Sequence, residues 1–258
     1  MLVLLPPSEG KTPPRRGAPL DLSALRLPAL TDARERVLEA LVSISRDDAD
    51  SAAAALDLGP TQRGLVERNA ALRDAPTTRA DRVYTGVLYD ALDPASLSAS
   101  AKRRASARVL VTSALLGVVA PGDRIPAYRL SGDTTLPGLG PVAALWREAL
   151  DPVLGDVLAG GLLIDLRSTA YAAFWRPPAE RAARVATVRV LQERDGRRSV
   201  VSHFNKATKG RLVRALLEEG ADPRTPTALA GVLRDLGWDV EQDDGPRGSR
   251  LDVVVSEL

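Results

Sequence analysis

Lysines are rare in this chain, and most of them lie in short segments that contain other uncommon residues. The sequence has 31 arginines but only four lysines, and three of these four are Lys11, Lys206 and Lys209. Arginine stays charged, whereas a lysine is a compact point charge that can lose its proton when it is desolvated. Lysines kept against so strong an arginine bias therefore indicate an anion-binding charge, or a catalytic base or nucleophile.

Residues 202–211 hold the densest group of such side chains. This segment contains the single histidine, one of two asparagines and three cations, namely His203, Asn205, Lys206, Lys209 and Arg211. We expect a helix to begin at Asn205 and to run to about residue 219, with Lys206 and Lys209 on the face of its first turn. Cations there oppose the helix dipole unless an anion binds, so the segment predicts an anion site. The structural alternative is that Asn205 caps the helix.

A second candidate segment follows the first apolar run of the chain. Residues 2–5 predict a short buried strand, which two prolines end before the polar residues Ser8, Lys11 and Thr12. Ligands of α/β proteins commonly bind at the carboxyl ends of strands, and hydroxyl, ammonium and loop N–H groups suit an anion. The loop is not a P-loop, because Leu5 stands where the first glycine is required and two further prolines prevent a helix from following.

Other polar and aromatic residues near predicted strand ends complete the candidate site. The added ligand-positioning candidates are Tyr84, Tyr128, Arg129, Arg167, Ser168 and Tyr171. Ser168 also suits the N-cap of a short helix that runs to residue 175. Tyr84 has a plain alternative as a half-buried packing residue, and that alternative is the better interpretation of its neighbour Tyr89.

Charge is distributed unevenly along the chain, although the net charge is only +2. Residues 167–214 carry 12 basic and 3 acidic residues, whereas residues 215–258 carry 4 basic and 10 acidic residues. A basic segment of this kind predicts a surface that binds nucleic acid, a nucleotide or another phosphate. The alternative is an ordinary solvated face in an arginine-rich protein.

Composition excludes several kinds of site. The sequence has no cysteine, which excludes disulfides, thiolate metal sites and cysteine nucleophiles and favours a reducing compartment, the cytoplasm. With one histidine and no acidic cluster at metal-ligand spacing, we expect neither a structural metal nor a cofactor. No apolar run approaches the length of about 20 residues that a membrane helix needs, and the N-terminus lacks the features of a signal peptide.

Strand and helix patterns alternate early in the chain and form hairpins late. Beyond the first strand, they predict strands over 108–113 and 162–166, and helices over 31–45 and 139–154. A hairpin is expected within 184–204 around Asp195 and Gly196, and a helix ending at Gly237 precedes a C-terminal strand pair. We therefore expect one mixed α/β domain over residues 1–258, in which helices flank a mixed sheet.

Five ordered motifs together resemble those of the YaaA family of bacterial peroxide-stress proteins. The residues that carry this resemblance are the loop at 4–12, the sequence Val-Tyr-Thr-Gly-Val at 83–87, the stretch 113–130 ending in Tyr-Arg-Leu, the segment 164–171, and the Lys-Gly helix at 202–214. This chain differs from the family pattern at Arg167, at Ala170 and at Lys209, where many members have arginine. The resemblance implies a compact mixed α/β fold with a positively charged cleft. It also implies a cytoplasmic role in limiting hydrogen-peroxide damage, linked to lower free iron, together with DNA binding.

Two functions remain open at this stage. A basic cleft that neutralises DNA phosphates explains the positively charged segment. The alternative is an enzyme acting on a small anionic, nucleotide-like or nucleobase-like substrate, with Lys11, Lys206 and Lys209 as hypothetical catalytic groups. A purely structural role leaves the lysine cluster unexplained, and direct iron storage is disfavoured because histidines and hard-ligand clusters are missing. The oligomeric state is left open.

Overall fold

The first strand, β1 (Leu2–Leu5), occupies the middle of the sheet because all four of its residues are apolar and can be buried on both faces. It pairs in parallel with β3 (Val109–Ser113) on one side and with β8 (Leu163–Asp165) on the other. The computed structural model describes residues 1–158, 160–194, 197–200 and 202–255, the last range without the side chains of residues 202–204.

Parallel and antiparallel pairs are mixed in this sheet, as expected from the sequence. The strand order is β11–β12–β9–β8–β1–β3–β4, and β10 pairs with β9. The remaining strands are β4 (Gly117–Val119), β9 (Val185–Arg194), β10 (Arg197–Ser199), β11 (Asp239–Gly245) and β12 (Gly248–Val255). The contacts of β1, β3, β8, β9 and β12 along the middle of the sheet are parallel, whereas β4, β10 and β11 pair antiparallel to their neighbours.

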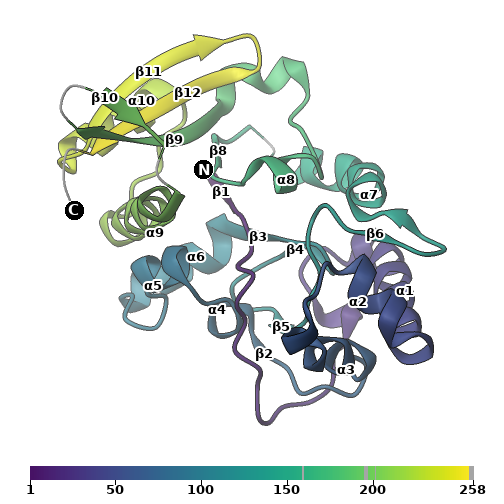
Figure 1. Cartoon of the computed structure of the whole chain (residues 1–258). Helices are drawn as coiled ribbons and strands as arrows, with labels where there is room; N and C mark the ends of the chain where they lie inside the picture. Colours follow the sequence, from purple (N-terminus) through teal and green to yellow (C-terminus); the bar gives the residue numbers. More distant parts are fainter. Residues whose placement is uncertain (159, 195–196, 201, 256–258) are drawn as a thin grey trace.

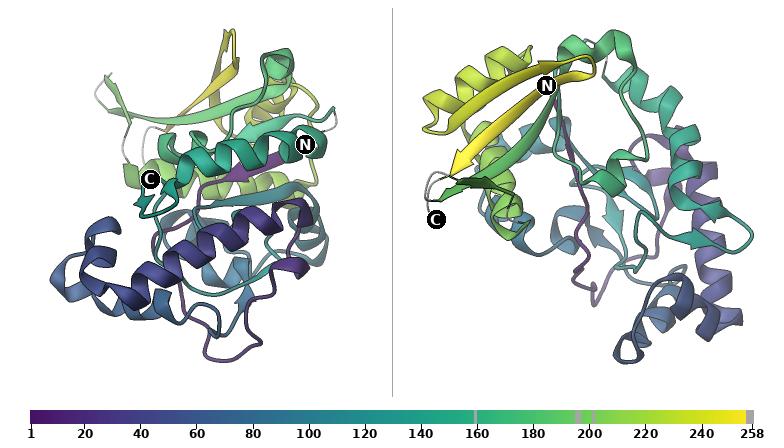
Figure 2. Two further views of the ribbon diagram at one scale, coloured as in Figure 1. Left: turned by 90° about the vertical axis from the view of Figure 1, so that its right-hand side faces the viewer. Right: turned by 45° about the horizontal axis from the view of Figure 1, so that its top comes forward.

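Helices cover both sides of the central strands (Figure 1). On one side lie α5 (Val87–Leu92), α6 (Ala99–Arg108) and α9 (Ser202–Glu219). On the other lie α1 (Thr31–Asp47) and α7 (Val142–Val157), which stand in front of the strands in the left view of Figure 2. The short elements are α2 (Ala49–Ala55), α3 (Gly64–Ala70), α4 (Ala80–Val83), α8 (Thr169–Ala172), α10 (Pro226–Asp235), η1 (Leu22–Ala24), η2 (Pro28–Leu30), η3 (Pro60–Gln62), η4 (Ala179–Arg184), β2 (Thr78–Arg79), β5 (Arg124–Ile125), β6 (Thr135–Leu136) and β7 (Gly140–Pro141).

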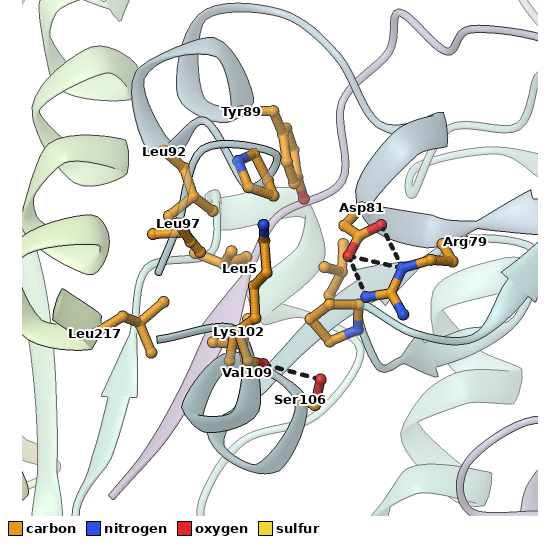
Figure 3. A pocket seen from close by; sticks show the side chains of 14 residues that line it. Leu5, Arg79, Asp81, Tyr89, Leu92, Leu97, Lys102, Ser106, Val109 and Leu217 are labelled. Atoms are coloured by element: carbon orange, nitrogen blue, oxygen red, sulfur yellow. Dashed lines mark hydrogen bonds and ion pairs between the residues drawn. The ribbon is translucent and has the colours of Figure 1, made fainter. Parts of the chain in front are cut away.

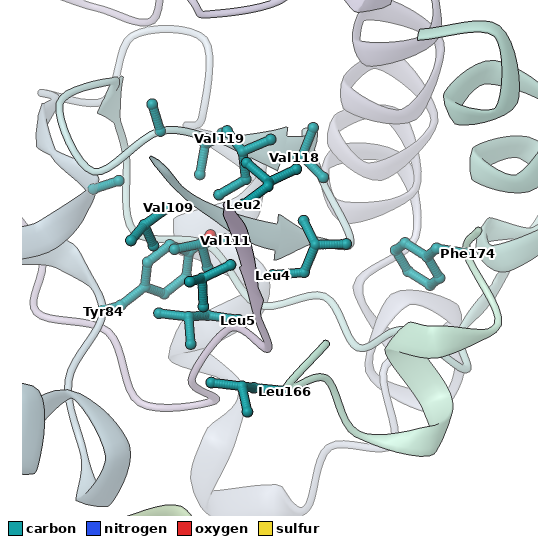
Figure 4. Close-up of a cluster of buried hydrophobic side chains, with 14 of the residues drawn as sticks. Leu2, Leu4, Leu5, Tyr84, Val109, Val111, Val118, Val119, Leu166 and Phe174 are labelled. Carbon is teal, nitrogen blue, oxygen red and sulfur yellow. The ribbon is translucent and has the colours of Figure 1, made fainter. Parts of the chain in front are cut away.

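The hydrophobic core lies on both faces of β1 because side chains of a strand alternate between the two faces. Leu4 points toward the side where Phe174 lies, and Leu5 points toward Tyr84 (Figure 4). Both leucines are fully buried. The fully buried Arg34 on α1 donates to the carbonyl oxygens of Leu116 and Val118, so it links α1 to the segment of β4.

Most predicted elements are confirmed, with boundaries that move by a few residues. The strands expected at 2–5, 108–113 and 162–166 are β1, β3 and β8, and the helices expected at 31–45 and 139–154 are α1 and α7. The hairpin is formed by β9 and β10, while its predicted turn at Asp195 and Gly196 lies outside the described residues. The C-terminal strand pair is β11 and β12.

The predicted start of the lysine helix is wrong. α9 begins at Ser202, since residues 202–204 include neither proline nor glycine and so extend the helix upstream. Asn205 is therefore inside the helix and is not its cap, and Lys206 and Lys209 lie beyond the first turn. The helix dipole acts mainly on the first turn, so the dipole argument for an anion at these lysines is weakened.

A close approach between α9 and α5 depends on Gly210. A Cβ atom at this position would overlap the carbonyl oxygen of Leu88 and would lie 3.0 Å from the Cβ of Ala91. Glycine is thus required for a steric reason in the Lys209–Gly210 pair. The contact brings the lysines of α9 next to the turn that precedes α5.

We expect Gly210→Ala to destabilise the protein by about 1–3 kcal/mol, because overpacking outweighs the gain in helix propensity of about 1 kcal/mol. Urea unfolding followed by circular dichroism measures the change. Gly231→Ala is the matched control, since Gly231 is inside α10 and a Cβ there has no atom within 4 Å. A Gly210→Ala protein as stable as wild type would contradict the steric role.

Candidate functional site

A cleft of about 460 Å³ opens at the carboxyl ends of β1 and β8. Four segments line it: residues 6–10 after β1, residues 85–89 at the start of α5, residues after β8, and α9. The sequence predicts that the loop after the first strand lies at a strand end, where ligands commonly bind. The structure confirms this position of the loop.

Six of the predicted site residues line this cleft. They are Ser8, Ser168, Tyr171, Asn205, Lys206 and Lys209. The side chain of Lys206 is exposed, whereas Lys209 is partly buried and its Nζ donates a hydrogen bond to the carbonyl oxygen of Leu166 at 3.2 Å. Burial lowers the pKa of Lys209, and the charge of Asp165 opposes this shift. The two lysines of α9 thus present one solvated and one desolvated ammonium group.

Asn205, also on α9, adds to the cleft a hydrogen-bond acceptor that has no partner in the described part of the chain. Its Oδ1 atom is buried and has no hydrogen-bond partner among the described residues. A buried polar atom without a partner costs free energy, and a hydrogen-bond donor from a ligand would satisfy it.

Four further predicted residues do not line the cleft but lie next to the loop at 8–10, which does. They are Lys11, Tyr84, Tyr128 and Arg129. Lys11 forms an isolated antiparallel bridge with Tyr84, and the Oγ of Ser8 accepts a hydrogen bond from the backbone N–H of Thr85 at 3.0 Å. These contacts hold the loop after β1 against the turn before α5.

The Lys11 ammonium group lies against tyrosine rings. Its Nζ is 4.4 Å from the centroid of the Tyr128 ring and 5.8 Å from that of Tyr84, and it donates to the carbonyl oxygen of Ser8 at 2.8 Å. Burial, followed by the charge of Arg129 and a smaller effect of Arg68, lowers the pKa of Lys11 to about 7, while Glu9 acts in the opposite direction. A lysine with this pKa can act as a base or a nucleophile near neutral pH.

Hydroxyl groups form a short chain beneath Lys11. The Tyr128 hydroxyl is 2.7 Å from the Oγ of Ser113 and 3.1 Å from the hydroxyl of Tyr84. Burial raises the pKa of both tyrosines, so they remain neutral hydrogen-bonding groups. Ser113 was not among the predicted residues, although its place at the end of a predicted strand was a signal that could have found it.

Arg167 does not reach the cleft. Its Nη2 is 2.7 Å from Asp165 and donates to the carbonyl oxygen of Trp175 at 2.9 Å, and its side chain is 1% exposed. Arg167 therefore joins the end of β8 to the segment after α8. Ser168 is the N-cap residue of α8, but its side chain makes no capping hydrogen bond.

The other predicted residues lie elsewhere. Thr12 and Arg211 are exposed and do not line the cleft, and the side chain of His203 lies outside the described residues. Glu9 and Arg68 were missed, and they contribute charge next to Lys11. Glu9 is adjacent to residues that were selected, whereas Arg68 comes from α3 and the sequence carried no signal that would bring it there.

Part of the basic segment is neutralised by the acidic C-terminal strands. Arg189 on β9 forms an ion pair with Asp252 on β12 at 2.5 Å, and Arg198 on β10 pairs with Glu241 on β11 at 2.9 Å. Because β12 lies beside β9, charges that are separated along the sequence face each other across the sheet. The uneven charge of the sequence therefore overstated the number of cations available to a ligand.

A second cavity lies near α6 and shares the lining residue Tyr89 with the cleft (Figure 3). The Arg79–Asp81 ion pair lies on one side of it and leucines such as Leu92 and Leu217 on the other. Its volume is about 30 Å³, which is room for about one or two water molecules. The cleft is therefore the better candidate for a ligand site.

The described part of the chain has neither a membrane-spanning helix nor a cluster of metal-ligating side chains. No helix there is long and apolar enough to cross a membrane. No group of three or more histidine, cysteine, aspartate or glutamate side chains there is arranged to hold a metal ion.

Fold and site together define an α/β protein with a lysine-containing cleft at the strand ends of a mixed sheet. The family model that matches residues 1–244 is described as peroxide stress protein YaaA. The chain belongs to this family, and the resemblance in its motifs is confirmed.

Curated relatives share the full length of the chain. A UPF0246 protein of Streptomyces coelicolor is 53% identical over 100% of both chains. A UPF0246 protein of Corynebacterium efficiens is 42% identical over 99% of this chain and 100% of its own length, and one of Corynebacterium glutamicum is 39% identical over the same shares.

We expect Lys11 to titrate near pH 7 in the folded protein, because burial and the charge of Arg129 disfavour its protonated form. Reductive methylation with ¹³C-formaldehyde followed by NMR suits a chain with four lysines, and Lys→Arg variants assign each signal. Glu9→Gln should lower the midpoint further, because the Glu9 carboxylate raises this pKa. A Lys11 signal that does not change until above about pH 9 would refute the assignment.

Proposed function

We propose that this protein is a cytoplasmic peroxide-stress protein that limits hydrogen-peroxide damage and binds DNA in the cleft between α9 and the loop after β1. Membership of the peroxide stress protein YaaA family supports the stress role. Any effect on intracellular iron is indirect in this proposal, since a chain with no cysteine and one histidine offers few of the ligands that iron sites use.

The observation that carries the DNA-binding proposal is the position of Lys206 and Lys209. Both lie on α9, three residues apart, and both line the same cleft. Lys206 is exposed and free to reach a backbone phosphate. Contacts of this kind neutralise phosphates without reading base sequence, so binding should be tolerant of sequence and sensitive to salt.

We expect Lys206→Gln and Lys209→Gln each to weaken binding of a short DNA duplex, and each to reduce the slope of log K against log salt by about 1, since each removes one phosphate contact. Fluorescence anisotropy at several salt concentrations measures both quantities. Lys102→Gln is the control, because it makes the same charge change at an exposed lysine that does not line the cleft. An affinity that does not vary with salt would rule out this mode of binding.

A second candidate function is an enzyme that acts on a small anionic, nucleotide-like or nucleobase-like substrate. The observation that favours it is Lys11, which is buried next to the cationic Arg129 and has a pKa of about 7, as suits a base or nucleophile. In this alternative, Lys206 and Lys209 hold the negative charge of the substrate while Tyr171 and Ser168 position the rest of it.

If this alternative holds, nucleotides and nucleobases should raise the melting temperature of the wild-type protein, and Lys206→Ala should reduce the shift. Lys11→Met should abolish turnover while it leaves part of the shift, because it removes the reacting amine and keeps the charges on α9. Lys102→Ala is the control for general loss of charge. The absence of any ligand-dependent shift in wild type and variants would argue against an enzyme of this class.

A further inference from the structure

Three cations lie near Glu9, which belongs to the loop after β1 and lines the cleft. They are Lys11, Arg68 and Arg129, which we call the Lys11 cluster. The charges of Arg129 and Arg68 both act on the ammonium group of Lys11. Within the described residues, the carboxylate that pairs with this cluster is that of Glu9. Arginine side chains are always charged, whereas Lys11, with a pKa of about 7, is only partly charged at neutral pH. The cluster therefore carries between two and three positive charges against the one carboxylate of Glu9.

Arg129 has hydrogen-bonding capacity that the protein does not use. Its Nε is buried and has no hydrogen-bond partner among the described residues. Its Nη1 is 3.6 Å from Glu9 Oε2, which is longer than a hydrogen bond. A guanidinium group has five N–H donors in a planar fork that matches the oxygens of a phosphate or a carboxylate.

The backbone of Arg129 is held in place although its guanidinium group is not satisfied. The side chain of Asn69 is fully buried; its Oδ1 accepts from the N–H of Arg129 at 2.9 Å, and its Nδ2 donates to the Arg129 carbonyl oxygen at 2.7 Å. Asn69 is also the neighbour of Arg68 on α3. One pair of hydrogen bonds therefore positions both arginines of the cluster.

Glu9 is poorly suited to be a permanent partner of these cations. Its side chain is 84% exposed, and its ion pair with Arg129 is long. Exposed ion pairs of this kind contribute little to stability. Glu9 also lines the cleft, so its carboxylate lies where an anionic ligand would arrive.

We propose that the Lys11 cluster is a subsite for a phosphomonoester dianion, and that the Glu9 carboxylate occupies this subsite until the ligand displaces it. A phosphomonoester carries nearly two negative charges at neutral pH and matches the two to three positive charges that remain when Glu9 moves away, whereas a phosphodiester of the DNA backbone carries one. This subsite rests on the proposed function, because it adds a site for a terminal phosphate to the cleft that binds DNA. The shared chemistry is a dianionic phosphate, either free or at the end of a nucleic acid.

Calorimetric titration with inorganic phosphate tests the subsite directly. We expect Glu9→Gln to tighten phosphate binding, and Arg129→Gln and Arg68→Gln each to weaken it by about tenfold, because each removes a charge-assisted hydrogen bond. Arg68→Gln serves as a second removal variant should Arg129→Gln fail to fold. Glu219→Gln is the control, because it makes the charge change of Glu9→Gln at the exposed end of α9. Equal phosphate affinity in wild type, Glu9→Gln and Arg68→Gln would overturn the proposal.

Binding of one DNA duplex, prepared either with 5′-phosphate or with 5′-hydroxyl ends, shows whether the phosphate belongs to a nucleic-acid end or is free. Tighter binding of the phosphorylated duplex, lost in Arg68→Gln, supports a nucleic-acid end as the ligand. Equal binding of both duplexes, with the phosphate pattern intact, supports free phosphate at the same subsite. If no duplex binds, the DNA-binding function fails, while the inorganic-phosphate titration still decides the subsite.

Discussion

Parallel hydrogen bonding of β1 to both β3 and β8 decides where the cleft forms. Because these three strands run in the same direction, their carboxyl ends reach the same edge of the sheet, so the loop after Leu5, the segment after Leu166 and Ser113 all lie close together. β1 is paired on both edges and buried on both faces, so two neighbouring strands and the core fix its position. The segments that form the site are therefore attached directly to buried strands of the core.

Helix α9 brings the second half of the site to this edge. Its contact with α5 is close enough to require glycine at position 210, and this contact sets the distance from Lys206 and Lys209 to the turn at residues 85–89. A steric constraint on one side of α9 thus positions the charged side chains on another. The packing of α9 against α5 therefore explains both residues of the Lys-Gly motif. Gly210 allows the close contact, and this contact places Lys209 at the cleft.

Fewer cations are available to a ligand than the distribution of charge along the sequence indicates. Cations on β9 and β10 are paired with acidic residues of β11 and β12, as in the Arg189–Asp252 pair. By contrast, Lys11 lies next to other cations and against the Tyr128 ring, with Glu9 as a weak counter-charge. Burial first, and then the charge of Arg129, lowers the pKa of Lys11. The unbalanced positive charge around Lys11 also favours an incoming anion.

Local sequence patterns were enough to predict the buried strands, the mixed α/β fold, the loop after β1 and six of the residues that line the cleft, because strand burial and rare lysines leave a signal within a few residues. The predicted start of α9 was wrong because asparagine favours helix caps over helix interiors, whereas Asn205 lies inside the helix. Arg167 pairs locally with Asp165, two residues before it in the sequence, and so does not reach the cleft. Two outcomes depended on contacts between distant segments: the pairing of Arg189 and Arg198 with the acidic C-terminal strands, and the approach of Arg68 to Lys11. Charge acts through space, and only the folded chain decides which charges are neighbours.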